Sequence, residues 1–76
     1  MSAAADYRLQ SFYEESAAEY QAIGRRRYAD ARAAADPRRR AWLQKYAAEA
    51  AGQAQFYLCL AVELNAYLST REEIAK

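Results

Sequence analysis

Apolar positions in the second half of the chain repeat with the spacing of a coiled-coil helix. Between residues 43 and 68 they advance by four and three residues in alternation. This spacing keeps one stripe of side chains against one neighbouring helix. We therefore expect a helix over about residues 37–68, whose main stripe consists of Leu43, Ala47, Ala50, Ala54, Tyr57, Ala61, Leu64 and Leu68.

A second apolar stripe lies beside the first on the same expected helix. Glu49, Gln53 and Glu63 interrupt it, and Leu58 and Val62 add a third, short stripe. A helix in a two-helix hairpin has only one side to bury, so this excess predicts a further contact. The pattern alone leaves open which stripe faces the core of the hairpin. The second stripe consists of Trp42, Tyr46, Phe56, Leu60 and Tyr67.

The first half of the chain predicts a helix over about residues 6–34 with a less regular apolar side. Its last third is weaker, with Tyr28, Ala31 and Ala35. Four tyrosines on this helix recur at spacings of six to eight residues, which is compatible both with core packing and with a binding surface. The main apolar positions are Leu9, Phe12, Tyr13, Tyr20 and Ile23, with Ser16 and Ala17 on the same side.

Asp36 and Pro37 separate the two expected helices. An aspartate carboxylate accepts hydrogen bonds from the unpaired N–H groups of a helix's first turn. Proline suits the first helical position, since its missing N–H would have no partner there, and it disfavours helical geometry at the preceding residue. We therefore expect the first helix to end near residues 33–35 and the second to begin at Pro37.

The expected fold is an all-α antiparallel two-helix hairpin forming a single domain over residues 1–76. If the turn centres on Asp36, residues whose numbers sum to about 73 face each other. This places Tyr20 opposite residues 53–54 and Gly24 opposite residues 47–52. Residues 69–76 form a tail, in which Thr70–Glu73 matches a capping box and predicts either a short third helix or a continuation of the second. A chain of 76 residues has little core of its own, so we expect a second copy or a partner to complete a four-helix bundle.

The sequence contains no recognisable catalytic, metal-binding or cofactor-binding motif. One cysteine and no histidine leave no intrachain disulfide, no zinc cluster and no carboxylate–histidine metal site. We expect no metal, no cofactor, no catalytic residue and no enzymatic activity, with Cys59 as a small buried apolar residue. The start lacks the features of a secretory signal, and the longest apolar run, residues 56–62, is far shorter than the roughly 20 residues that span a bilayer. A cytoplasmic protein is expected, or one secreted without a cleaved signal.

Charge is segregated along the chain although the net charge is only +1. Residues 25–45 carry eight basic and two acidic groups, whereas residues 6–19 and 46–76 are both net acidic. In a hairpin, the turn end is therefore basic and the open end acidic. Arginines 38–40 stand at a helix start, where the helix dipole opposes them. Their placement therefore lacks a local benefit and is the better hint of function. The candidate basic patch consists of Arg25, Arg26, Arg32, Arg38, Arg39 and Arg40.

Three interpretations of this cluster stay open: a solvated tip, a protein contact or a nucleic-acid site. The leading functional hypothesis is a small non-enzymatic protein–protein interaction module, such as an adaptor, a co-chaperone-like subunit or a binding inhibitor. The alternative is a nucleic-acid-binding hairpin that uses arginines 25–27 and 38–40. The candidate interface residues are Phe12, Tyr20, Trp42, Phe56, Leu60 and Tyr67.

In size and hairpin layout the chain resembles the small co-chaperones of type III secretion systems. It is also similar in style to phage and bacterial helical hairpins that inhibit a partner by binding it. Both resemblances imply action by protein contact, and neither carries a motif from which functional residues could be assigned. A third possibility is a designed sequence that has no natural role, which the alanine-rich helices permit.

Overall fold

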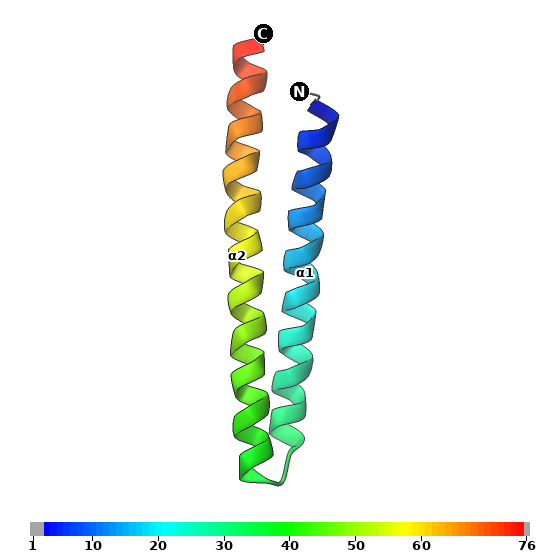
Figure 1. The fold of residues 1–76 in the computed structure, drawn as a ribbon, viewed down its shortest axis with the longest axis vertical. Coiled ribbons are helices and arrows are strands. Elements are labelled where there is room, and N and C mark those ends of the chain that lie inside the picture. Colours follow the sequence, from blue (N-terminus) through cyan, green and yellow to red (C-terminus); the bar gives the residue numbers. More distant parts are fainter. Residues whose placement is uncertain (1–2, 76) are drawn as a thin grey trace.

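The computed structural model describes residues 3–75, and the side chains of residues 4–71. Within this part the chain forms two α-helices and no strand: α1 spans Ala3–Ala33 and α2 spans Pro37–Ala75. The helices run antiparallel, and both termini lie at the end opposite the turn (Figure 1). The result is a rod with extents of 59 × 15 × 15 Å. The predicted all-helical hairpin is confirmed.

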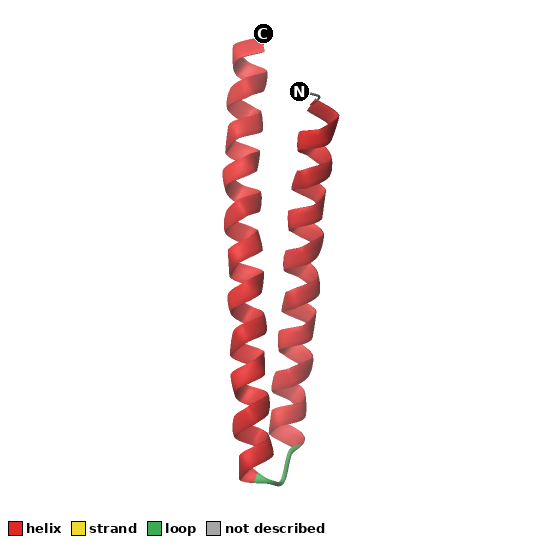
Figure 2. Cartoon of the chain, in the orientation of Figure 1, coloured by secondary structure: helices red, strands yellow, loops and turns green. Residues whose placement is uncertain are grey.

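The turn forms as its residue types predict. Ala34 N donates to Ala31 O at 3.2 Å, which tightens the last turn of α1. Asp36 Oδ1 accepts a hydrogen bond from Arg38 N at 3.1 Å, and Asp36 O accepts one from Arg40 N at 2.9 Å. Asp36 is therefore the N-cap of α2, and only residues 34–36 connect the helices (Figure 2).

The main stripe of α2 is the one that faces α1. Six of its eight members are buried, and Tyr57 and Leu64 are half-buried. The spacing of four and three residues also continues to Arg71, which is half-buried although it is charged.

The side of α1 that faces α2 also follows a heptad spacing, although its apolar residues alone do not reveal it. Its members advance by alternating steps of four and three residues and are all buried or half-buried. Asp6, Gln10, Gly24 and Arg27 belong to it, and these residue types hide it from a search for apolar positions. The heptad consists of Asp6, Gln10, Tyr13, Ala17, Tyr20, Gly24, Arg27 and Ala31.

Alanine makes up most of the hairpin core. Six of the eight buried apolar residues are alanines, and the other two are Leu43 and Leu68. Near the turn, a Cβ added to Gly24 would lie 3.5 Å from Ala47 O and 3.7 Å from Ala50 Cβ, so the helices are close there. The predicted position of Gly24 opposite residues 47–52 is confirmed. Such short side chains let the backbones approach but bury little apolar area.

Tyr57 fills the middle of the hairpin, where its ring contacts four other rings. It stacks on Tyr20 with centroids 5.8 Å apart and planes at 9°, and it meets Phe12 edge-on at 6.2 Å. Tyr13 and Phe56 complete the cluster. Tyr20 was expected to face residues 53–54. It reaches Tyr57 because side chains lean towards the N-terminus of their own helix, which brings the two rings together from opposite directions.

The region 69–75 continues α2 without a break, and no separate third helix occurs in residues 3–75. Thr70 Oγ1 donates to Ala66 O at 3.0 Å inside the helix, so Thr70 does not begin a new one. Arg71 Nη1 donates to Asp6 Oδ2 at 2.8 Å, and this ion pair joins the open ends of the two helices. The helix therefore extends beyond the expected end at about residue 68, since this stretch holds neither glycine nor proline.

We predict that Gly24→Ala stabilises the protein. The added Cβ would make ordinary van der Waals contacts with α2, and alanine is favoured over glycine in a helix by about 1 kcal/mol. Gly52→Ala is the matched control, because nothing lies within 4 Å of its added Cβ. Urea unfolding followed by circular dichroism at fixed protein concentration should show a gain of about 0.5–1 kcal/mol for both variants. A loss confined to Gly24→Ala would contradict the described separation of the helices.

We also predict that Asp6 and Arg71 are energetically coupled. The Asp6 side chain is 17% exposed and that of Arg71 41%, so solvent screens the pair only in part. A double-mutant cycle with Asp6→Ala and Arg71→Ala should give a coupling of about 0.5–1 kcal/mol. Strictly additive effects on unfolding would show that the ion pair contributes nothing.

Candidate interaction surface

The hairpin has two long sides that differ in composition. In two antiparallel right-handed helices, the residue before each core residue projects to the same side on both helices. The ring of Phe12 on α1 and that of Phe56 on α2 accordingly both contact Tyr57. We call this side the aromatic face; its large apolar members are Leu9, Phe12, Ile23, Trp42, Tyr46, Phe56, Leu60 and Tyr67.

The aromatic face leaves large rings in solvent. Phe12 is 53% exposed, Trp42 54%, Phe56 56% and Tyr67 55%. These side chains extend over most of the length of α2 and include the open end of α1, so they are not one isolated exposed residue. Glu49, Gln53 and Glu63 interrupt the face. Exposed apolar surfaces of this extent are typical of interaction sites in proteins.

The elongated shape of the chain also leaves an unusually large surface exposed. Its accessible surface is 5878 Å², whereas a compact protein of 8.6 kDa exposes about 4,700 Å². Its radius of gyration is 17.3 Å, against about 11 Å for a compact domain of this length. A single hairpin therefore buries much less surface than a stable domain of its size.

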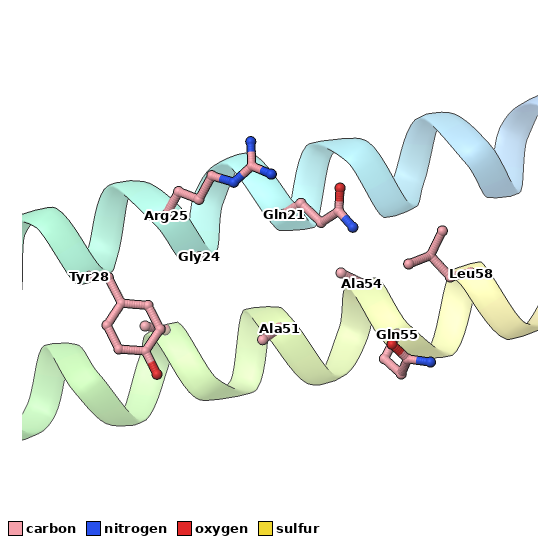
Figure 3. A pocket seen from close by; sticks show the side chains of 9 residues that line it. Gln21, Gly24, Arg25, Tyr28, Ala51, Ala54, Gln55 and Leu58 are labelled. Atoms are coloured by element: carbon pink, nitrogen blue, oxygen red, sulfur yellow. The ribbon is translucent and has the colours of Figure 1, made fainter.

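The opposite side carries a shallow groove of mixed character. Gly24 and Ala54 border it at the core, and polar side chains from both helices surround it (Figure 3). Its volume is about 250 Å³, and it is open to solvent along its length. Most of its lining residues directly follow a core residue, which confirms the assignment of the two sides; these are Gln21, Arg25, Tyr28, Ala51, Gln55 and Leu58.

The structure divides the predicted interface residues between the core and the aromatic face. Phe12, Trp42, Phe56 and Tyr67 are exposed on that face, and Leu60 is half-buried there. Tyr20 lies between the helices, stacked on Tyr57. The tyrosines of α1 likewise divide: Tyr13 and Tyr20 are half-buried in the core, whereas Tyr7 and Tyr28 are exposed on the opposite side.

The basic tip comprises residues 25–45. Two of its arginines make contacts between the two ends of the hairpin turn region. The Arg27 guanidinium lies 5.4 Å from the centroid of the Tyr46 ring, and its Nη1 donates to Tyr46 O at 3.3 Å. Arg40 Nη2 donates to Ala34 O at 2.8 Å. The expectation that arginines 38–40 gain no local benefit is therefore wrong for Arg40, which satisfies a carbonyl at the C-terminal end of α1.

The other arginines of the tip are exposed, and no ion pair involves them within the described side chains. Successive helical residues point about 100° apart, so neighbouring arginines diverge. Arg38 and Arg39 therefore project in different directions at the start of α2. The tip is a basic cap that surrounds the turn rather than a flat basic patch; its exposed members are Arg25, Arg26, Arg32, Arg38 and Arg39.

Cys59 is exposed, so the expectation that it is buried is wrong. The apolar run at residues 56–62 surrounds α2, but only Tyr57 and Ala61 in it turn directly to α1. Cys59 projects from the far side of the helix, where Gln55 Nε2 lies 3.6 Å from its Sγ. No group of three potential metal-ligating side chains occurs among the described residues. In the same part of the chain, neither helix has the length and hydropathy needed to cross a membrane.

Comparisons with known proteins gave no match: no family model fits the chain, and no curated protein or solved structure is similar to it.

We predict that Arg27 contributes to stability and that Arg25 does not. Arg27→Ala removes the hydrogen bond to Tyr46 O and the contact with its ring, which should cost about 1 kcal/mol. Arg25→Ala removes an equal charge from an exposed position two residues away and should change stability by less than about 0.5 kcal/mol. Equal effects of the two substitutions on urea unfolding would contradict the structural role of Arg27.

Proposed function

We propose that this chain is a protein–protein interaction module whose aromatic face is covered by helices of another polypeptide. The supporting observation is the contrast between a core of six alanines and two leucines and a face on which four large rings are more than half exposed. The largest apolar side chains of the hairpin thus lie where only a second molecule can bury them. Aromatic residues are also those that contribute most binding energy when an interface covers them.

In this proposal the chain acts by binding, as an adaptor, a co-chaperone-like subunit or a binding inhibitor. On α2 the exposed rings of Trp42, Phe56 and Tyr67 lie on one side of the helix, and Phe12 of α1 lies beside them on the same face. Covering this face would convert the two-layer hairpin into a bundle with a core of aromatic rings.

Binding of nucleic acid by the basic tip is the second candidate. The five exposed arginines without an ion pair in the described part of the chain favour it. Their divergent directions limit the number that could contact one phosphate backbone. If the tip is the site, replacing Arg38 and Arg39 by serine should abolish binding to a short RNA or DNA duplex, and binding by the unsubstituted chain should fall steeply with salt.

Photocrosslinking in cells tests the leading proposal. A benzoylphenylalanine introduced at Phe56 should form a discrete adduct with a polypeptide, either another chain or a second copy. The same group at Val62 is the matched control, because Val62 is 68% exposed but does not belong to the aromatic face. The proposal predicts an adduct at position 56 that is absent at position 62. No adduct at position 56, or the same adducts at both positions, would contradict it.

A further inference from the structure

Building on the proposed function, we propose that a second copy of this chain covers the aromatic face and that the two hairpins pack head to tail. The basic tip of each copy then lies over the acidic open end of the other. All four helices are antiparallel to their neighbours, and α2 packs against α2 of the second copy.

The area available is sufficient for such a dimer. The chain exposes 5878 Å², about 1,200 Å² more than a compact protein of its mass. A stable interface buries about 800 Å² per partner. An interface of that size would lower the exposed surface of each chain to about 5,100 Å², nearer to the value of about 4,700 Å² for a compact protein.

The positions of the large rings fit a twofold axis at the middle of the hairpin. Trp42 and Tyr67 lie 25 residues apart on α2, or about 37 Å, and their midpoint falls between residues 54 and 55. An axis there brings Trp42 of one copy beside Tyr67 of the second and places Phe56 of both copies near the centre. On α1 the axis passes near residue 19, since Gly24 lies opposite residues 47–51 and facing numbers therefore sum to about 73.

Charge selects this orientation over the parallel one. Residues 25–45 carry a net charge of +6, whereas residues 6–19 carry −3 and residues 46–76 carry −2. A dimer with both turns at one end would place two +6 regions within the Debye length of about 8 Å, which repels. The head-to-tail dimer instead places each basic region against an acidic one.

Light scattering on the purified full chain tests the dimer itself. The expected mass is twice the chain mass of 8.6 kDa over the micromolar range. Phe56→Asp should reduce the mass to that of one chain, because it places a charge beside the axis. Val62→Asp, on another side of α2, should remain dimeric. A monomeric unsubstituted chain, or dissociation by both variants alike, would overturn the proposal.

The distance between spin labels tests the orientation. Cys59→Ser removes the native thiol, and Ala41→Cys provides a single labelling position on the exposed side of α2 near the turn. In the head-to-tail dimer the two positions are about 40 Å apart along the bundle. In a dimer with both turns together they would be separated only by the bundle width, below about 25 Å. The short distance would overturn the proposal.

The outcomes separate this inference from the proposed function. A monomer whose position 56 still crosslinks to a different polypeptide in cells would overturn the head-to-tail dimer and leave the interaction module intact. A monomer without any adduct at position 56 would overturn both.

Discussion

The close approach of the two helices along an alanine seam is the constraint on which the rest of this structure depends. Ala17, Gly24 and Ala31 on α1 meet a stripe on α2 that is also mostly alanine. Short side chains bring the backbones together and leave little room for rings between them. Apart from the cluster around Tyr57, the large aromatic side chains are therefore directed outward. The exposed face is a consequence of how the core is built.

The same alanine seam limits the stability of a single hairpin. Alanine burial contributes little apolar area, and the polar contacts that supplement it lie near the two ends: Arg27 and Arg40 towards the turn, and Asp6 with Arg71 at the open end. Such contacts align the two helices with each other but add little to the stability of the fold. Partly exposed polar pairs contribute only about 1 kcal/mol or less. Under the proposed function, a second molecule that covers the exposed rings would add the larger share of the hydrophobic stabilisation.

The sequence predicts α2 and the turn well because their signals are local. Asp36 and Pro37 act through their own backbone geometry, and the α2 stripe is apolar throughout. The matching heptad of α1 could not be found in this way, since polar residues and a glycine occupy several of its positions. Gly24 and Arg27 are core residues because of contacts with α2 that the sequence does not reveal. Arg40 was likewise misjudged, because its acceptor belongs to the end of α1. Cys59 could not be assigned from an apolar run that surrounds the whole helix.

Trp42 provides the most direct test of the account, because it is the only tryptophan and belongs to the aromatic face. It is 54% exposed on the single hairpin, and in the proposed head-to-tail dimer it would lie against Tyr67 of the second copy. The measurement is its fluorescence emission and its quenching by acrylamide over a dilution series of the purified chain. The account predicts blue-shifted, weakly quenched emission at high concentration that becomes red-shifted and strongly quenched on dilution. Emission typical of an exposed indole at every concentration would contradict the claim that a second copy covers this face.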